Sequence, residues 1–494
     1  MIVAASIPTP DVDWTALAPT LALLAASALC LLGAVLFPSD SRRLFSAVVS
    51  FAGFVAAGIL AAGVYADTPD GVSLIADSMT RDRLAALAQI LLAGIGALVV
   101  LGSHGDRRRE HVGEYYALLT AAGAGMIFFV SAGNLMTLFL GLEWFSIALY
   151  VLCALDTHRE QSLEAGLKYL VIGAFGSAIL LFGSALVYGA TGELGFDAIR
   201  DAPGADDPLF VTGLAMILAG LAFKVSAAPF HMWTPDVYEG APTPVTAFMA
   251  AATKAAAFVV TWRVLVTAFP EQAEIWTVAA AALACTSLVV GNLAALVQDD
   301  VKRMLAYSSI SQAGFLLIAV AANNESGGSA LLYFLIPYTA ATVGAFAVVS
   351  ARERELDRPV SVQGLAGLGW ERPLHGVAMW VFMLSFAGFP LTGGFLGKFT
   401  VFTAAYESGW WWLIVVGVVF TAVSIAYYMG IVRSMYMRAS AFDGTTPVAV
   451  GGSPPADRAL DLALLAAIAV VVGSFFAVEP LFDLATDAIA QLPL

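Results

Sequence analysis

The sequence predicts an all-α polytopic membrane protein, with about fourteen transmembrane helices in a single membrane domain. Hydrophobic residues make up 60% of the 494 residues and charged residues only 12%, against roughly 25% charged in soluble domains. A helix needs about 20 apolar residues to cross the hydrocarbon core of a bilayer. Stretches of this kind recur along the whole chain, so we expect lipid to be its main solvent.

The predicted helices follow one another almost without interruption. Stretches free of Asp, Glu, Lys and Arg cover residues 15–38, 44–66, 84–105, 115–142, 169–192, 275–298, 304–324, 326–351, 373–397, 408–432 and 462–478. Three equally apolar stretches, 131–155, 208–239 and 241–268, contain isolated charges. We therefore predict three N-terminal helices (1–110), helices four to eight (111–270), helices nine to thirteen (271–440) and a C-terminal helix (441–494).

Two of these helices are expected to be broken. Pro229 follows Lys224 within one long apolar stretch, and Pro390 with several glycines precedes Lys398 in another. Proline removes a helix hydrogen bond and clashes with the preceding turn. The two stretches cross the membrane in opposite directions, which is typical of inverted repeats. We predict two inverted five-helix repeats, 111–270 and 271–440, each with a broken helix.

The distribution of basic residues predicts the orientation in the membrane. Loops after odd-numbered helices hold most of the Lys and Arg residues, including Arg42, Lys302 and Arg303, whereas the opposite loops are rich in acids such as Asp67 and Glu271. Because Lys and Arg mark the cytoplasmic side, both termini are predicted to lie outside.

Five basic residues cannot be assigned to loops. They are Lys168, Lys224, Lys254, Arg263 and Lys398. A charge at the bilayer centre costs about 2.5–3.5 kcal/mol and usually marks an ion or proton pathway. Lys168 has Glu164 four residues before it, so an interfacial ion pair is an equally good interpretation. Arg263 is near a helix end and is expected to extend to the interface.

The remaining candidates are an acid and a polar patch. Glu143 lies mid-way along the fifth predicted helix, with no basic residue within one turn. Its partner must come from another helix, either in a proton path or in a structural ion pair. Lys224 could alternatively extend toward the membrane surface. Tyr307 and Gln312 flank three serines at the start of the tenth helix, where they could align water or join helices.

Several classes of site are excluded. The sequence contains no nucleotide-binding glycine motif, its three cysteines are far apart, and its five histidines lack metal-ligand spacing. No cofactor is expected in this chain, so any redox chemistry must belong to partner subunits. The formal net charge of −14 argues against binding to nucleic acid.

Four segments resemble one family, the antiporter-like subunits of bacterial NADH–quinone oxidoreductase (respiratory complex I), and among these subunit N. The segments are 141–152 (GLEWFSIALYVL), 229–244 (PFHMWTPDVYEGAPTP), 301–312 (VKRMLAYSSISQ) and 388–399 (GFPLTGGFLGKF). The lysine at position 398 and the short C-terminus favour subunit N over its sister subunits M and L. The similarity extends from the fourth helix to the thirteenth.

The resemblance implies a proton-translocating subunit of the bacterial cytoplasmic membrane, coupled to quinone reduction in partner subunits. The proton-carrying acid and lysines of the family match Glu143, Lys224, Lys254 and Lys398, and Lys168 matches a further lysine. NADH, flavin, iron–sulfur clusters and quinone belong to other subunits. Many relatives have a histidine where this chain has Gln312, so a titratable relay is not expected there.

Two other functions remain open. A subunit of a multisubunit sodium/proton antiporter would share the fold, and an inactive scaffold could bridge neighbouring subunits. Four titratable residues deep in the membrane argue against a scaffold, because apolar residues would be cheaper to bury there.

Overall fold

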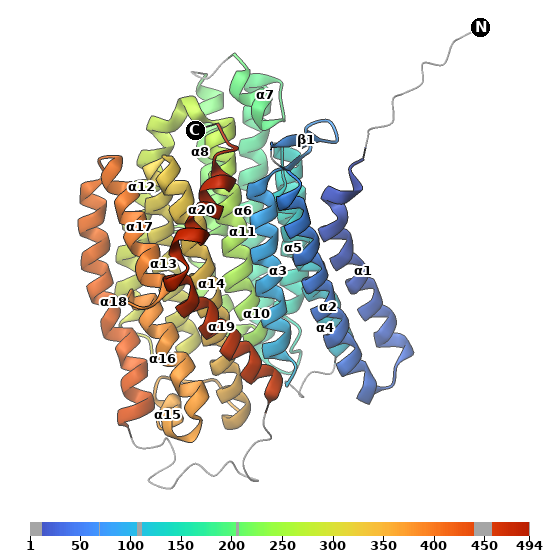
Figure 1. Cartoon of the computed structure of the whole chain (residues 1–494), viewed down its shortest axis with the longest axis vertical. Helices are drawn as coiled ribbons and strands as arrows, with labels where there is room; N and C mark the ends of the chain where they lie inside the picture. Colours follow the sequence, from blue (N-terminus) through green and yellow to red (C-terminus); the bar gives the residue numbers. More distant parts are fainter. Residues whose placement is uncertain (1–11, 69, 106–110, 204–206, 439–456, 494) are drawn as a thin grey trace.

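The computed structural model is a bundle of long helices, drawn in Figure 1. It describes residues 12–68, 70–105, 111–203, 207–438 and 457–493. Within these ranges the strands are β1 (Val72–Leu74) and β2 (Met79–Arg81), a short antiparallel hairpin. The predicted boundaries at residues 110 and 440 lie outside the described residues, as do both chain ends.

Twelve helical segments in these ranges are long and apolar enough to cross a membrane. They are α1 (Trp14–Leu36), α2 (Ser39–Ala66), α3 (Arg83–Ser103), α4 (Val112–Val130), α5 (Leu135–Cys153), α6 (Glu160–Thr191), α10 (Thr243–Phe248) with η1 (Met249–Thr253) and α11 (Lys254–Ala268), η2 (Pro270–Gln272) with α12 (Ala273–Ala295), α13 (Val301–Ala322), α14 (Glu325–Leu356), α18 (Trp411–Met437) and α19 (Arg458–Phe476).

Two further apolar segments are each divided into two shorter helices. These pairs are α8 (Pro208–Lys224) with α9 (Trp233–Gly240), and α16 (Pro373–Ala387) with α17 (Gly393–Glu407). The short helices α7 (Phe196–Asp201), α15 (Leu368–Glu371), η3 (Gln363–Leu365) and α20 (Val478–Ile489) lie between or after the long ones. The prediction of an all-helical polytopic membrane protein is confirmed.

Both divided segments break where proline and glycine residues interrupt the sequence. Beyond the end of α8, Ser226 has a φ of 63° and Pro229 cannot donate a backbone hydrogen bond. Beyond α16, Gly388 and Leu391 have φ values of 77° and 70°. Lys224 precedes its break whereas Lys398 follows the other, so the halves differ in detail. The inverted repeats over 111–270 and 271–440 remain a prediction.

The segment that contains Lys254 has an irregularity that its sequence does not predict. The five residues Met249–Thr253 form a π-helical turn, and Lys254 follows it directly. Such turns are rare and often occur at functional sites. The wider turn joins α10 to α11 without breaking the helix, and it sets the direction in which Lys254 leaves the backbone.

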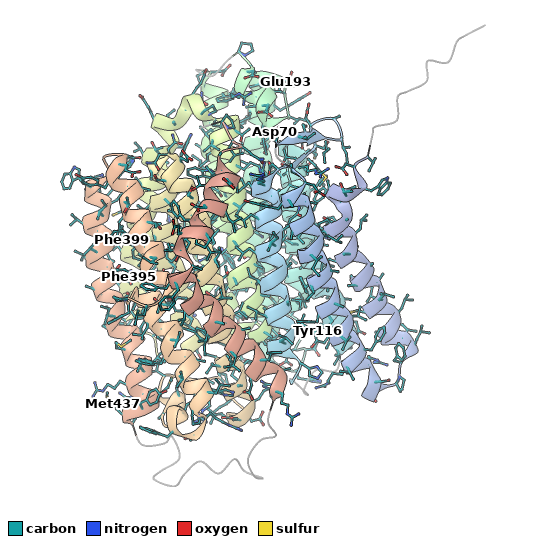
Figure 2. All side chains as sticks on the ribbon, in the orientation of Figure 1. Asp70, Tyr116, Glu193, Phe395, Phe399 and Met437 are labelled. Atoms are coloured by element: carbon teal, nitrogen blue, oxygen red, sulfur yellow. The ribbon has the colours of Figure 1, made fainter. Side chains whose placement is uncertain are left out.

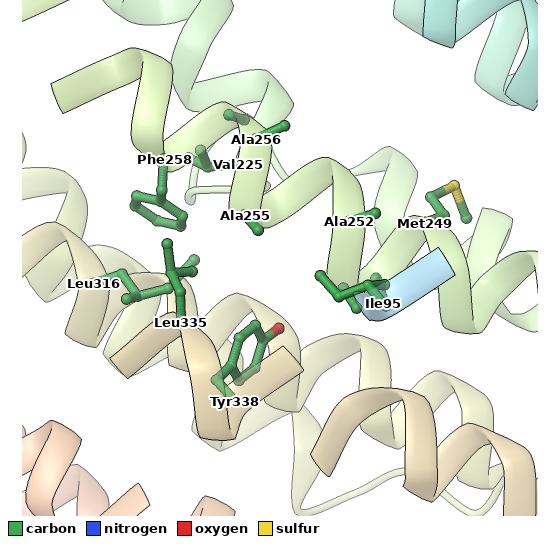
Figure 3. Packing of buried hydrophobic residues seen from close by; sticks show 14 of the residues in the cluster. Ile95, Val225, Met249, Ala252, Ala255, Ala256, Phe258, Leu316, Leu335 and Tyr338 are labelled. Atoms are coloured by element: carbon green, nitrogen blue, oxygen red, sulfur yellow. The ribbon is translucent and has the colours of Figure 1, made fainter. Parts of the chain in front are cut away.

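Three segments form the interior of the bundle. The segment from α10 to α11, helix α13 and helix α14 are almost entirely buried, whereas α1, α6 and α18 leave much of their surface exposed. Figure 3 shows Phe258 of α11 close to Leu316 of α13 and Leu335 of α14. Lys254 and Gln312 therefore belong to the centre of the bundle and not to its lipid-facing surface.

The two ends of the bundle differ in the residues that they carry. Helix α1 begins and α20 ends at the upper end in Figure 1. Asp70 and Glu193 lie at this same end, and Met437 lies at the opposite end (Figure 2). The described chain thus begins and ends on one side, as predicted. Which side of the membrane this is remains a prediction.

Candidate functional site

Three lysines are buried inside the bundle. Lys224 is the last residue of α8, Lys254 is the first of α11, and Lys398 lies in the second turn of α17. Their exposed fractions are 3%, 1% and 4%. Among the described residues, no carboxylate forms an ion pair with any of them. Their ammonium groups rest instead on neutral acceptors and aromatic rings.

Lys224 is held by helix α5. Its Nζ donates to Ser146 Oγ at 2.6 Å and lies 4.5 Å from the centre of the Phe145 ring. Ser146 in turn donates to the carbonyl of Leu142. Glu143 interacts with Lys224 electrostatically but forms no direct ion pair with it. The buried Oε1 atom of Glu143 has no hydrogen-bond partner in the described part of the chain.

Lys254 is held by helix α13. Its Nζ donates to both the carbonyl oxygen and the Oγ of Ser309, each at 2.5 Å. The Oγ of Ser309 is also 3.1 Å from the hydroxyl of Tyr338 on α14. A serine, a tyrosine and a lysine from three interior helices therefore meet at one point.

Lys398 binds the end of the other half of its broken helix. Its Nζ donates to the carbonyl of Phe386 at 2.8 Å and lies 4.2 Å from the centre of the Phe315 ring. Phe386 is in the last turn of α16, where unpaired carbonyl groups attract a cation. Gly388 leaves room for this side chain, because a Cβ atom there would lie 3.1 Å from Lys398 Cδ.

Gln312 connects the surroundings of Lys254 and Lys398. Its Nε2 donates to the Phe386 carbonyl at 3.0 Å, the same oxygen that Lys398 binds, and to the Tyr428 hydroxyl at 3.1 Å. The Tyr428 hydroxyl is 2.6 Å from Ser308 Oγ, and Ser308 is the neighbour of Ser309 in α13. A row of polar groups thus runs from Lys254 to Lys398.

A small cavity lies beside this row. It has a volume of about 10 Å³, and Ser308, Ser309, Tyr338 and Thr342 contribute hydroxyl groups to its wall. This volume is at the lower limit for a single water molecule, which needs two to four polar partners. The cavity can therefore hold at most one water molecule between the two lysines, and its hydroxyl groups are suitable partners for that water.

Comparison with known proteins assigns the family. The family model described as "NADH:quinone oxidoreductase/Mrp antiporter, TM" matches residues 132–424. NADH-quinone oxidoreductase subunit N of Trichlorobacter lovleyi is 41% identical over 427 residues, which cover 84% of this chain and 87% of the relative. The chain belongs to the subunit N family. It is therefore a subunit of the membrane arm of proton-pumping respiratory complex I.

Solved structures agree with this assignment. A chain of respiratory complex I from Thermus thermophilus, solved with bound aureothin, is 34% identical, with a TM-score of 0.78 over 95% of this chain and 99% of that chain. A chain of the Mrp complex from Dietzia sp. is 20% identical, with a TM-score of 0.84 and 97% coverage of both chains. The second likeness shows the fold alone, which subunit N shares with the Mrp chain.

Lys168 lies in an ion-pair cluster near the beginning of α6. Its Nζ is 2.7 Å from Glu164 and 2.7 Å from Asp236 of α9. Asp236 also binds Arg303, which reaches Glu239 at 2.8 Å. The expected pair with Glu164 is present, and the cluster fixes α9 to both α6 and α13. Lys168 is 38% exposed, unlike the three buried lysines.

Tyr307 lies apart from the polar row. It is half-buried, and its hydroxyl makes no hydrogen bond within the described ranges. Sequence reasoning missed Ser146, Tyr338 and Tyr428, which hold or connect the lysines. Ser146 could have been found, because it lies three residues after Glu143 on the same face of α5. Tyr428 is in a helix whose sequence gives no such signal.

Two predictions about basic residues are wrong. Arg263 does not extend to the interface but donates from both terminal nitrogens to Asp82, at 2.5 and 2.8 Å, and both side chains are buried. The turn that precedes α3 brings Asp82 over the end of α11. Lys302, which we assigned to a loop, is only 1% exposed and donates to the Ala241 carbonyl at 2.7 Å.

Proposed function

We propose that Glu143, Lys224, Lys254 and Lys398 carry protons through this subunit while quinone is reduced in partner subunits. The observation that most supports this is the row of polar groups between Lys254 and Lys398. Hydroxyl groups and water both donate and accept hydrogen bonds. These hydroxyl groups, with water in the small cavity, can pass a proton from Lys254 as far as Tyr428. The Gln312 amide only donates and the Phe386 carbonyl only accepts, so a second water molecule must join Tyr428 to Lys398.

The surroundings of the lysines suit a reversible change of charge. Burial penalises the charged form of a lysine, and an opposing carboxylate would favour it. None of the three ammonium groups forms a direct ion pair within the described chain, and only Lys224 has a carboxylate, that of Glu143, acting on it from a distance. Moving one charge against the membrane potential needs about 2.3 kcal/mol per 100 mV, and a tenfold change in proton affinity corresponds to about 1.4 kcal/mol. A change of less than a hundredfold in the proton affinity of a buried lysine is therefore enough to move one charge against 100 mV.

Glu143 and Ser146 offer Lys224 two alternative partners. They are three residues apart on α5 and therefore on neighbouring turns of one face. In the described arrangement Ser146 binds the ammonium and one oxygen of Glu143 is unpaired. We expect Lys224 to hold its proton when it turns to Glu143. When it returns to Ser146, it releases the proton toward Lys254.

The position of Glu143 points to a neighbouring subunit. Leu140 and Ile147, on the same face of α5, are 52% and 57% exposed. A carboxyl group at mid-span is expensive to expose to lipid. We therefore expect another membrane-arm subunit of complex I to cover this face and to present a polar or basic group to Glu143.

The cofactors and the orientation complete the proposal. NADH, flavin, iron–sulfur clusters and quinone are handled by partner subunits. The described residues hold no group of three His, Cys, Asp or Glu side chains that could bind a metal ion. The chain lies in the bacterial cytoplasmic membrane with both termini outside, as the basic loops predict.

The test uses the assembled complex in proteoliposomes. Glu143→Gln and Lys224→Ala should lower NADH-driven proton pumping, because each removes a titratable group from the path, while assembly persists. Glu143→Asp keeps the carboxylate and should retain more pumping than Glu143→Gln. Full pumping in both Glu143→Gln and Lys224→Ala would refute the proposal.

The shared fold supports one alternative, a subunit of a sodium/proton antiporter. Sodium-dependent transport by the assembled complex, without NADH-linked activity, would favour it. A purely structural role is distinguished by the quadruple variant that lacks all four titratable residues. Pumping at the wild-type level in that variant would support a scaffold.

A further inference from the structure

A large cavity opens at the end of the bundle where α4 begins and α14 ends. Its volume is about 350 Å³, and its wall carries charged or titratable side chains of both signs: His111, Asp156, His158, Arg159, Glu353, Arg354, Asp357 and Arg358. The start of α10 and the connection between α5 and α6 complete the wall. The basic loops predict that this end faces the cytoplasm, so the cavity is accessible to the side from which protons would be taken up.

Glu353 lies at the inner side of this cavity. It accepts a hydrogen bond from Thr243 Oγ1, and its Oε1 is 3.8 Å from Nζ of the buried Lys302. Oε1 has no hydrogen-bond partner in the described residues. Oε1 is buried and forms an ion pair with Lys302, so Thr243 and Lys302 together hold the carboxyl group at the wall of the cavity.

One face of α14 continues from Glu353 toward Lys254. Tyr338, Thr342, Phe346, Ser350 and Glu353 are spaced by four, four, four and three residues, so they lie along a single face of the helix. Ser350 and Glu353 line the large cavity. Tyr338, Thr342 and Phe346 line the small cavity beside Ser309, which binds Lys254. The two cavities therefore follow each other along one helix face.

Phe346 interrupts this otherwise polar face. Its ring packs edge-on against Tyr238 of α9, with 6.2 Å between centroids and an angle of 77°. Both side chains are almost completely buried. Thr342 and Ser350 are eight residues apart, or about 12 Å along the helix, which no single hydrogen bond can span. An apolar constriction of this kind excludes water until it widens.

We infer that protons reach Lys254 from the cytoplasm along this face of α14, collected by Glu353 and gated by the Phe346–Tyr238 contact. When the two rings are in contact, they separate the outer cavity from the polar groups around Ser309. When the rings move apart, water enters between Ser350 and Thr342. This inference rests on the proposed role of Lys254 in carrying protons, and it adds a second supply of protons to that residue, beside Lys224, with its route and its barrier.

The experiment measures protons pumped per NADH oxidised by the assembled complex in proteoliposomes. Phe346→Ser should lower this ratio toward that of Lys254→Ala, because permanent hydration lets protons return to the cytoplasm. Phe346→Leu keeps the constriction apolar and should retain the ratio. Phe382→Ser is the matched control, since Phe382 is equally buried and contacts α14 on its opposite face, at Gly344.

A second variant tests the carboxyl group. Glu353→Gln should slow NADH-driven proton pumping, and Glu353→Asp should recover most of it. If Phe346→Ser and Phe382→Ser pump the same number of protons per NADH, the Phe346–Tyr238 contact is not a barrier. If Glu353→Gln pumps at the wild-type rate, Glu353 does not collect protons. Both results count only against this route, provided that Lys254→Ala lowers pumping. Undiminished pumping in Lys254→Ala would refute the proposed function itself.

Discussion

At the scale of single residues, the structure gives Gln312 a different role from the one that the sequence suggests. The sequence suggests a gap in the path, because an amide cannot titrate. In the structure the amide donates to the oxygen that binds Lys398 and to Tyr428. In the proposed path it would therefore order the neighbouring groups without a charge of its own.

This role predicts the effect of removing the amide. Gln312→Leu should slow proton pumping by the assembled complex, because Tyr428 and the Phe386 carbonyl each lose a hydrogen bond. The free energy of unfolding should fall by about 1–3 kcal/mol, the usual result of leaving a buried polar group unpaired. Gln89→Leu is the control, since Gln89 is also buried and bonds Ser131 elsewhere in the bundle. Equal pumping rates in the two variants would contradict the assignment.

The candidate residues could be found from the sequence, but their partners could not. Lys224, Lys254 and Lys398 stand out because each charge interrupts an apolar stretch. Tyr428 lies more than a hundred residues from Ser308, and nothing in either segment indicates that their helices are neighbours. The failure at Arg263 has the same cause, since its partner Asp82 is 181 positions away.

At the scale of elements, the broken helices are predictable because proline and glycine act locally on the backbone. The π-helical turn before Lys254 was not predicted, because its sequence Met249–Thr253 is ordinary for an α-helix. Packing in the crowded interior, and not local preference, must determine that turn. The contact between Lys398 and the end of α16 depends on the break in the same way, since the break turns a carbonyl toward the lysine.

Gly388 tests how strongly this break controls Lys398. Gly388→Ala should lose stability of about 1–2 kcal/mol, because an L-residue is strained in the left-handed region. It should also lower pumping, because the new Cβ atom crowds Lys398. Gly409→Ala introduces the same strain, at a φ of 78°, with no atom within 4 Å of the new Cβ. Thermal unfolding should therefore be similar in the two variants, and only Gly388→Ala should lose pumping. Equal pumping in both would show that the contact is dispensable.

At the scale of the whole molecule, the direction of proton movement depends on the orientation in the membrane. The cavity beside Glu353 lies at the end rich in basic residues, where Arg433 and Arg438 flank Met437. The opposite end carries Asp70 and Glu193 (Figure 2). The rule that basic loops stay in the cytoplasm therefore predicts proton uptake at the first end and release at the second.

Labelling of single cysteines tests this orientation in cells that contain the whole complex. In a Cys285→Ser background, Glu193→Cys should react with a membrane-impermeant maleimide in intact cells, because its loop is predicted to lie outside. Met437→Cys, at a residue that is 78% exposed, should react only in inside-out vesicles. The reverse pattern would place the cavity beside Glu353 on the outer side. The face of α14 would then be a route of proton release, and Lys398 would stand nearer to uptake.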